Sequence, residues 1–313
     1  MTSDFARAPL PSCRSGGDRA SVAEGIAGWL GSAAMTALLA AFGFRLPAAA
    51  PLGDRLADAA RFSSRWDYRK GKERHQAVGE EFEPELDALI RRTTAALGLA
   101  DCATPAERRY DHVLVLGGGV RTMLARAHLA ATTVLRDGIG VSAVAGLGST
   151  RPLVGQAETT RELGLRPCPT EGDAVAESLR REFGLGEPTS CRDGDGWWVR
   201  EHVDVRPPVS VLAAPSTRPG MRANTADTFV GWAEFLPGAA RDARLLLVTT
   251  DMFVPFQHCD AVRVLGLGYG ATIETIGFAT ATSRWVQPAD TFEVLQEVRS
   301  AIRSMQLLYA AVN

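Results

Sequence analysis

The sequence predicts a three-layer, Rossmann-like α/β fold, with a mainly parallel sheet between helices and an N-terminal helical region ahead of it. Two observations predict this fold. From residue 111 onward, short continuous apolar runs alternate with amphipathic stretches, which is typical of parallel strands joined by helices. Before residue 111, apolar side chains recur at helical spacing. We expect a disordered tail over residues 1–20, a helical region over 21–110 and the α/β domain over 111–313.

The helical region is expected to hold three helices, at residues 21–44, 52–62 and 83–97. Residues 25–44 contain no charged side chain, and we interpret them as a buried helix. The alternatives are a membrane anchor, or a packing face for a partner protein or a second copy of the chain. Residues 65–75 form the densest cluster of charges, which is typical of a solvated surface; a flap over an anionic ligand is the alternative.

In the α/β domain the apolar runs place strands at residues 112–116, 141–147, 209–214, 244–248 and 271–276. Helical periodicity places helices at residues 121–135, 171–183, 223–236, 256–265 and 292–311. A segment at about 186–207 interrupts this alternation. Within it, residues 193–205 alternate between apolar and polar side chains, which predicts an inserted β-hairpin.

Composition excludes several classes of partner. The net charge of −2 gives no global positive field, so we expect neither nucleic acid nor an anionic membrane surface to bind. The five cysteines are scattered and none shows zinc spacing, so we expect no metal site and a cytoplasmic location. All 34 basic residues except Lys70 and Lys72 are arginine, which indicates a GC-rich genome or the use of arginine to bind anions.

Small, polar and cationic residues follow the predicted strands. Ligands of open parallel sheets bind beyond the carboxyl ends of the strands, where glycines, hydroxyl groups and arginines can surround an anion. We therefore predict a site for a phosphate, sulfate or nucleotide, although the same residue types also cap helices. The predicted anion-binding residues are Gly117, Gly118, Gly119, Arg121, Ser149, Thr150, Arg151, Ser216, Thr217, Arg218, Arg222, Asn224, Thr225, Thr249, Thr250 and Gln257.

Three titratable side chains are candidates for catalysis. His258 follows a predicted strand end and is the candidate general acid or base; a histidine bonded to a carbonyl group is the equal alternative. Asp251 is a candidate for orienting that histidine or a substrate amine, or else a helix cap. Glu274 lies within a predicted strand, where it either faces the pocket as a base or pairs with an arginine.

Two glycine-rich stretches are weaker signals. Residues 117–122 follow a strand, but Thr122 replaces the last glycine of a dinucleotide fingerprint and no acidic residue ends the next strand. A nicotinamide or flavin dinucleotide is therefore not expected. We interpret residues 265–270 as the end of a helix and a turn. The sequence contains neither a phosphate-binding P-loop motif nor the GxSxG motif of serine hydrolases.

Several short motifs occur in a specific order: VLVLGGG at 113–119, LGSTRPL at 147–153, GDAVAESL at 172–179, Asn224-Thr225-Ala226-Asp227, and LLLVTTDMFVPF at 245–256. In this order they resemble the YdcF/SanA/ElyC family over roughly residues 111–278. The resemblance implies a Rossmann-like three-layer fold with the polar strand ends lining one pocket. Members of that family are associated with envelope metabolism or with a nucleotide-like ligand such as S-adenosylmethionine.

The chain departs from that family at the pocket. The family's His and Arg beyond its Val-Thr-Ser strand correspond here to Phe253 and Phe256. The acidic residue that the family keeps after its third strand is missing around Ala214 and Pro215. The resemblance therefore implies a fold and a pocket more than it implies a reaction.

These observations support three hypotheses for function. The first is an enzyme that acts on a small anionic metabolite by transfer, hydrolysis or intramolecular displacement of its anionic group, in an actinobacterial natural-product pathway. The second is a non-catalytic protein that binds a nucleotide or S-adenosylmethionine, or a subunit that packs on a partner or a second copy through residues 25–44. The third is an envelope protein anchored through residues 25–44. The sequence identifies no particular cofactor, although a nucleotide or S-adenosylmethionine would suit the strand ends.

Overall fold

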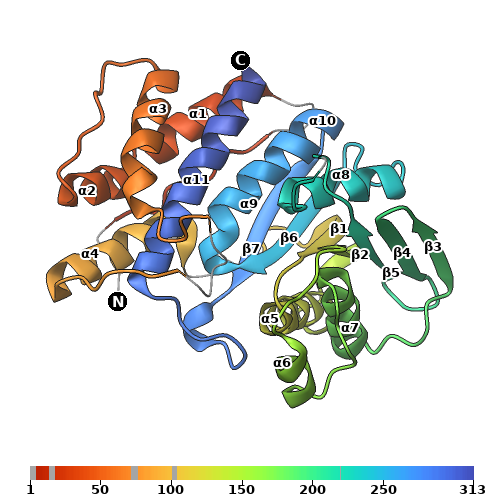
Figure 1. The fold of residues 1–313 in the computed structure, drawn as a ribbon. Helices are drawn as coiled ribbons and strands as arrows, with labels where there is room; N and C mark the ends of the chain where they lie inside the picture. The colour runs from red at the N-terminus through yellow and green to blue at the C-terminus, as the bar shows by residue number, and fades with distance from the viewer. Residues whose placement is uncertain (1–4, 14–17, 72–76, 101–103, 219) are drawn as a thin grey trace.

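The chain forms a mixed, mostly parallel sheet with helices on both faces, and a helical region stands beside it (Figure 1). The structure is a computed structural model, and it describes residues 5–13, 18–71, 77–100, 104–218 and 220–313. The predicted α/β class, the mainly parallel sheet and the N-terminal helical region are confirmed.

Within the described residues, the sheet holds its strands in the order β3-β4-β5-β2-β1-β6-β7. The parallel strands are β1 (Arg109–Leu116), β2 (Gly140–Ser149), β5 (Val209–Ala214), β6 (Arg244–Thr250) and β7 (Thr272–Phe278). Numbered among themselves along the chain, they run in the Rossmann order 3-2-1-4-5. The expected hairpin is present as β3 (Ser190–Gly194) and β4 (Trp197–His202), and it extends the sheet antiparallel to β5.

Alternate side chains of the strands enter two separate cores. Along β1, Val113 and Val115 pack in one core with α5 (Val120–Ala131) and α7 (Glu171–Phe183). Leu114 and Leu116 pack in the other core with α8 (Thr225–Phe235) and α9 (Val254–Ala261). The continuous apolar runs of the strands therefore result from burial on both faces.

The remaining helical segments of this domain are short, apart from the last one. They are α6 (Ala157–Glu162), the π-turns η4 (Thr132–Arg136) and η6 (Val262–Gly266), the 3-10 turns η5 (Asp251–Phe253) and η7 (Thr280–Thr282), α10 (Leu267–Tyr269) and α11 (Thr291–Val312). Gly270 ends α10 with φ 75°, so residues 265–270 are the helix end and turn that we predicted. Helix α6 lacks the apolar periodicity that would have predicted it.

The N-terminal region is helical, but its first helix is divided in two. The elements are α1 (Arg19–Leu30), α2 (Ala33–Ala41), α3 (Leu52–Phe62), η1 (Ser63–Trp66), α4 (Pro84–Thr94) and η3 (Ala95–Leu99). The single helix expected at residues 21–44 is wrong, because Gly31 ends α1 and the Ser32 hydroxyl accepts a hydrogen bond from Met35 N at 3.2 Å to begin α2. The axes of α1 and α2 differ by 44°.

The apolar side chains of α1 and α2 are buried inside the chain. Ile26, Trp29, Met35 and Leu38 are each fully buried in the core, which confirms the interpretation of residues 25–44 as core helix. Among the described residues, no single helix is long and apolar enough to cross a membrane; α1 and α2 reach that length and composition only as a bent pair.

Residues 5–13 are packed, in contrast to the disordered tail expected over residues 1–20. Ala8 and Cys13 are buried, and Ala8 N donates to the carbonyl oxygen of Ala96 at 2.8 Å. Asp18 caps α1, with its carboxylate accepting from Ala20 N at 3.1 Å. Although this segment is rich in proline, it therefore packs against the helices instead of being disordered.

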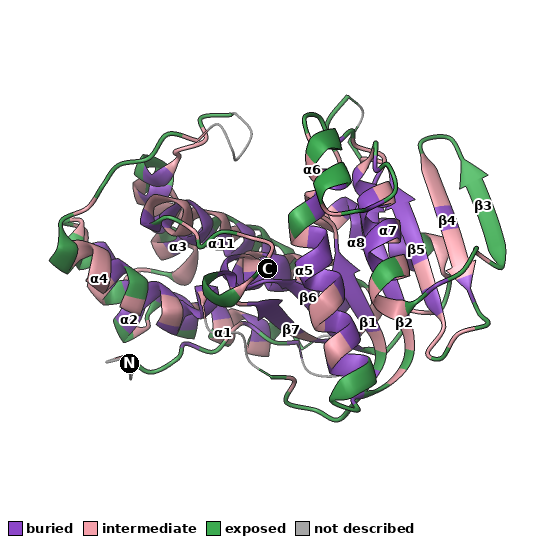
Figure 2. Cartoon of the chain, turned by 90° about the horizontal axis from the view of Figure 1, so that it is seen from below, coloured by how far each residue is buried: buried purple, intermediate pink, exposed green. Residues whose placement is uncertain are grey.

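Helix α11 returns to the N-terminal region and packs against α1, α3, α4 and α9. Its buried residues Val298, Ile302 and Met305 share one core with Trp29 and Leu56. Figure 2 shows these helices on one side and the sheet with α5 to α7 on the other. The first and last parts of the chain therefore form one helical layer beside the sheet.

Candidate functional site

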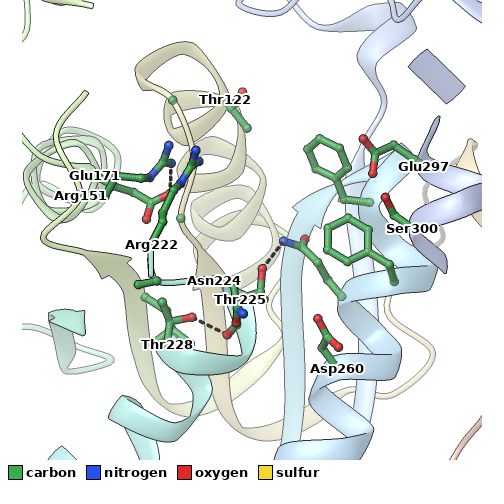
Figure 3. Close-up of a pocket in the computed structure, with 18 of the residues that line it drawn as sticks. Thr122, Arg151, Glu171, Arg222, Asn224, Thr225, Thr228, Asp260, Glu297 and Ser300 are labelled. Carbon is green, nitrogen blue, oxygen red and sulfur yellow. Dashed lines mark hydrogen bonds and ion pairs between the residues drawn. The ribbon is translucent and has the colours of Figure 1, made fainter. Parts of the chain in front are cut away.

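A cleft of about 950 Å³ lies between the carboxyl edge of the sheet and α11 (Figure 3). Its volume suits a small organic ligand. The sheet side bears Gly117, Gly118, Gly119, Thr122, Arg126, Leu147, Arg151, Gln156, Glu171, Arg222, Ala223, Asn224, Thr225, Thr228, Phe253, Phe256, Gln257 and Asp260. The opposite side bears Arg69, Glu293, Glu297, Ser300, Arg303 and Ser304.

The cleft lies where the strand order reverses. From β1 the chain passes to β2 on one side, whereas the later strand β6 is added on the other side of β1. The turn after β1 and the residues after β6 both line the cleft. Open α/β sheets bind their ligands in this crevice, so the topology by itself favours a binding site here.

The glycine turn after β1 lies against the guanidinium of Arg126, which is 1% exposed. Arg126 donates to the carbonyl oxygens of Leu116, at 2.7 Å, and Gly117. It also donates to the Thr250 hydroxyl at the end of β6, at 3.0 Å. A Cβ on Gly117 would lie 2.8 Å from the carbonyl oxygen of Leu147, so glycine is required there. Arg126 thus joins the ends of two strands and brings positive charge to the cleft.

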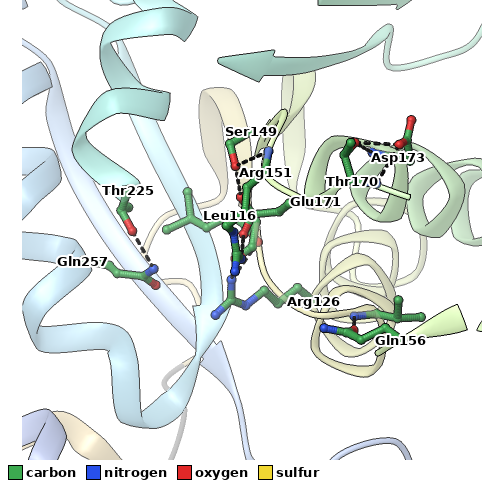
Figure 4. Close-up of polar contacts among 12 residues, drawn as sticks. Leu116, Arg126, Ser149, Arg151, Gln156, Thr170, Glu171, Asp173, Thr225 and Gln257 are labelled. Carbon is green, nitrogen blue, oxygen red and sulfur yellow. Dashed lines mark hydrogen bonds and ion pairs between the residues drawn. The ribbon is translucent and has the colours of Figure 1, made fainter. Parts of the chain in front are cut away.

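Arg151 and Glu171 form an ion pair in the cleft wall, with Nη2 2.6 Å from Oε1 (Figure 4). The Ser149 hydroxyl donates to the other oxygen of the same carboxylate at 2.6 Å. Glu171 begins α7, where the helix dipole stabilises a negative charge. The Arg151 side chain is 20% exposed, so it is oriented by Glu171 and still reaches the cleft with further N–H groups.

The start of α8 contributes polar groups that are mostly engaged within the protein. The Asn224 side chain accepts from Asp227 N at 3.1 Å and so caps the helix. Gln257 donates to the Thr225 hydroxyl at 3.1 Å, which joins α8 to α9 (Figure 4). Arg222, just before the helix, is exposed and lines the cleft. Capping, the alternative that we considered for Asn224, is therefore one of its roles.

The opposite side of the cleft, together with Asp260 of the sheet side that reaches it, is mixed in charge. Arg69 forms an ion pair with Glu297 of α11, whose side chain is 2% exposed. Asp260 of α9 lies 3.4 Å from the Arg263 guanidinium and also bonds with Ser304 of α11. Burial raises the pKa of the Asp260 carboxyl above its ordinary value, and the contacts with Arg263 and Ser304 partly oppose that rise.

Two aromatic rings of the sheet side follow β6. Phe253 and Phe256 both line the cleft and both are partly exposed. Their rings meet edge to face, with centroids 5.7 Å apart. The guanidinium carbon of Arg126 lies 5.7 Å from the centroid of Phe253, so the aromatic pair adjoins the glycine turn.

His258, the predicted acid or base, lies outside the cleft. It is 4% exposed, with Nε2 2.8 Å from the carbonyl oxygen of Pro11 and Nδ1 3.0 Å from the Thr275 hydroxyl. Burial lowers the pKa of His258 to about 4, although the bond to Pro11 opposes this shift. The alternative that we considered, a histidine bonded to a carbonyl group, therefore describes His258. Its two hydrogen bonds link the N-terminal segment to strand β7.

Asp251 and Glu274 do not line the cleft either. Asp251 is buried and accepts hydrogen bonds from Met252 N at 2.8 Å and Thr280 N at 3.1 Å, which fixes the turns after β6 and β7. Glu274 accepts from Ala106 N at 2.7 Å near the start of β7, at the opposite end of the sheet. Like His258, these two carboxylates make hydrogen bonds that stabilise the fold. The prediction that they lie at the site as catalytic groups is therefore corrected.

The predicted anion-binding residues divide into two groups. Those that line the cleft are Gly117, Gly118, Gly119, Arg151, Arg222, Asn224, Thr225 and Gln257. The others do not line the cleft. Arg121 is exposed and pairs with Glu162 at 3.0 Å, whereas Ser149, Thr249 and Thr250 are buried in the protein. Thr150, which follows β2, and Ser216, Thr217 and Arg218, which follow β5, also lie outside the lining. The Thr150 hydroxyl donates to the carbonyl oxygen of Gly196 at 3.3 Å, and the Thr217 hydroxyl bonds to Asp227.

Several lining residues were missed by reasoning from strand ends. Arg126 stands on α5 between Ala125 and Ala127, and an arginine among buried apolar residues was the signal that could have found it. Arg303 and Asp260 come from helix interiors, which strand-end reasoning does not reach. Arg69 belongs to the charge cluster for which a flap was the alternative; residues 72–75 of that cluster lie outside the described residues. No three His, Cys, Asp or Glu side chains gather into a metal-binding group within the described ranges.

Comparison with known proteins identifies relatives along nearly the whole chain. The protein Rv3785 of Mycobacterium tuberculosis H37Rv is 31% identical over 329 aligned residues, covering 94% of this chain and 91% of that protein. The chain belongs to the Rv3785 family. The family members MT3893 of Mycobacterium tuberculosis CDC 1551 and Mb3814 of Mycobacterium bovis show the same identity and coverage. All three bear the description of uncharacterized proteins, and all come from mycobacteria, which are actinobacteria.

The family model described as the Rv3785 N-terminal domain matches residues 13–98. This match covers the helical region from α1 to α4 and thus three of the helices on which α11 packs, namely α1, α3 and α4. The resemblance to the YdcF/SanA/ElyC family concerns the other part of the Rv3785-family chain, residues 111–278, and stays a prediction. No solved structure matches the chain.

Proposed function

We propose that the cleft binds a small metabolite bearing a phosphate, sulfate or nucleotide group, and that the protein is an enzyme that transfers, hydrolyses or displaces that group. One observation carries the proposal: arginines from five separate segments line the described part of one cleft. They are Arg69, Arg126, Arg151, Arg222 and Arg303.

The charges of the cleft favour an anion. Arg151 and Arg69 each pair with a glutamate of the lining, so an anion near them would complete an existing network rather than meet bare charges. Arg222 and Arg303 are exposed and come from opposite sides of the cleft, and an anion between them would be held from both. The glycine turn adds backbone N–H groups next to the buried charge of Arg126.

Catalysis on the bound group requires a side chain that exchanges a proton. We assign this role to Asp260 in place of His258, because Asp260 lines the cleft and its carboxyl is contacted by Arg263 and Ser304. Burial raises the pKa of the Asp260 carboxyl from its ordinary value, in the direction of neutral pH, where a general acid or base is most effective. The arginines would then stabilise the charge on the transferred or leaving group.

A non-catalytic protein that binds a nucleotide or S-adenosylmethionine is the second candidate. The observation that favours it is the placement of His258, Asp251 and Glu274 outside the cleft. An anchored envelope protein is a weaker proposal, because the apolar side chains of α1 and α2 are buried. A cytoplasmic location and a role in a natural-product pathway are further hypotheses, and they follow from the sequence alone.

Thermal-shift measurements at low salt test the binding proposal with phosphate, sulfate, AMP, ATP and S-adenosylmethionine. A ligand of the native state raises the unfolding temperature. We expect Arg222→Ala and Arg303→Ala to abolish this rise. Arg218→Ala is the matched control, since Arg218 is exposed and outside the cleft. If no anion raises the unfolding temperature, or if all three variants respond alike, the proposal is wrong.

The enzyme and the binding protein are separated by following the bound compound itself. Phosphorus NMR of a binding phosphate ester, incubated with the protein and an acceptor alcohol, reports any new phosphorus species. Turnover that Asp260→Asn removes while binding persists supports the enzyme. A bound ester that remains intact with the unmodified protein supports the non-catalytic candidate.

A further inference from the structure

The cleft is much larger than the anion that its arginines would hold. Its volume of about 950 Å³ accommodates an organic ligand many times the size of phosphate. The cationic side chains and the glycine turn occupy only part of the lining. The remaining surface is available to contact the rest of a larger ligand, and its chemistry indicates which kind of group would fit there.

The aromatic pair is the most distinctive part of that remaining surface. Phe253 and Phe256 stand on the first turns after β6, and both line the cleft without being fully buried. Side chains that serve only the core are normally removed from solvent, as Phe229 is at 0% exposure. Partly exposed aromatic rings in a cleft offer a surface on which a flat ring packs favourably.

The aromatic pair and the anion site lie within the length of one small molecule. The glycine turn follows β1 and Phe253 follows the adjacent strand β6, and neighbouring strands lie about 4.8 Å apart. The guanidinium carbon of Arg126 lies 5.7 Å from the centroid of the Phe253 ring, while Nη1 of the same guanidinium donates to the carbonyl oxygen of Gly117 in the turn. A ring on Phe253 or Phe256 would therefore carry an attached anionic group to the glycine turn.

We propose that the ligand joins its anionic group to a planar aromatic ring, and that Phe253 and Phe256 bind this ring. The inference rests on the proposed function, because it places the anion at the arginines. The ring contributes affinity by stacking, which tolerates different ring systems. The arginines and the glycine turn fix the orientation of the ligand by holding its anionic end.

Calorimetric titration of the full chain tests this with four probes: inorganic phosphate, ribose 5-phosphate, phenyl phosphate and AMP. We expect phenyl phosphate and AMP to bind about tenfold more tightly than ribose 5-phosphate, as stacking on aromatic side chains allows. The double variant Phe253→Leu/Phe256→Leu should lose this preference and keep the affinity for inorganic phosphate within about twofold. The double variant with tyrosine at both positions should keep the preference, because it keeps the rings.

Phe235→Leu is the matched control, since Phe235 is also partly exposed but stacks on Trp197 away from the cleft. It should leave all four affinities unchanged. Equal binding of AMP and ribose 5-phosphate, or a ring preference that survives in the leucine variant, overturns the inference alone. Failure of every probe, inorganic phosphate included, overturns the proposed function and the inference together. Retained phosphate binding shows that the leucine variant is folded.

Discussion

The guanidinium of Arg126 donates a hydrogen bond of 2.7 Å to the carbonyl oxygen of Leu116, so a side chain of α5 closes the end of strand β1. The same guanidinium reaches Thr250 at the end of β6. One buried positive charge thus supports the two strand ends between which the cleft opens. The cation is part of the fold before any ligand arrives.

Replacing Arg126 with methionine should destabilise the protein strongly. The carbonyl oxygens of Leu116 and Gly117 would lose a donor inside the protein, and each loss costs about 1–3 kcal/mol. We expect the free energy of unfolding to fall by roughly 2–4 kcal/mol in urea denaturation. Arg121→Met on the same helix is the control and should change it by less than about 0.5 kcal/mol, because Arg121 is exposed. Equal stabilities of the two variants would contradict the buried role of Arg126.

Substituting two glycines should have opposite effects on stability, because one lies at a close contact between elements and the other on an open helix face. A Cβ on Gly148 would lie 2.7 Å from the Cα of Gly172, so strand β2 and helix α7 must separate to admit it. We expect Gly148→Ala to lower the free energy of unfolding by about 1–3 kcal/mol. Gly28→Ala in α1 meets no atom within 4 Å and should be neutral or stabilising by up to about 1 kcal/mol. Thermal or urea denaturation of both variants measures the difference, and a stable Gly148→Ala variant would show that the two elements are not packed so tightly.

His258 should make the protein less stable as the pH falls. The unfolded imidazole binds a proton below pH 6.5, whereas the folded one does so only below about 4. Between these values the unfolded state holds more protons, so stability present above pH 6.5 is lost as the pH falls towards 4. Between pH 7 and 4.5 this group should account for roughly 2 kcal/mol. Urea denaturation of His258→Asn should show a pH dependence smaller by that amount; an unchanged dependence would mean that other groups cause it.

Neutralising Glu171 should strengthen the binding of phosphate. Glu171 is the partner of Arg151 in the cleft wall, so Glu171→Gln makes the lining more positive by one charge. We expect the affinity for inorganic phosphate at low salt to rise about fivefold, or about 1 kcal/mol. Glu162→Gln is the control, because Glu162 pairs with Arg121 outside the cleft. Weaker binding by Glu171→Gln would show that Glu171 positions Arg151 more than it competes with the ligand.

Most strands and long helices could be predicted because their apolar pattern follows burial directly. Strand β5 and helices α3 and α7 begin and end where the periodicity places them. The break between α1 and α2 was missed, although Gly31 and Ser32 are the residues that end one helix and cap the next. The packed path of residues 5–13 could not be predicted, because it depends on the distant contact of Pro11 with His258.

Some residues of the candidate site could be predicted from the sequence, and others could not. The turn after β1 and Arg151 follow strands that share one edge of the sheet, and this geometry is implied by parallel pairing. Arg303 and Asp260 could not be found in this way, because they enter the cleft from helices whose packing is set by the whole fold. His258 was misplaced because its position after a strand does not reveal which way α9 turns its side chains.

Helix α11 has a consequence for synthesis of the protein. It is translated after every other described element, yet it supplies one side of the cleft and much of the surface on which α1, α3 and α4 pack. Until residues 291–312 have left the ribosomal exit tunnel, the cleft lacks that side, and α1, α3 and α4 lack one of the helices on which they pack. The complete cleft therefore forms only after α11 has docked on the elements that precede it.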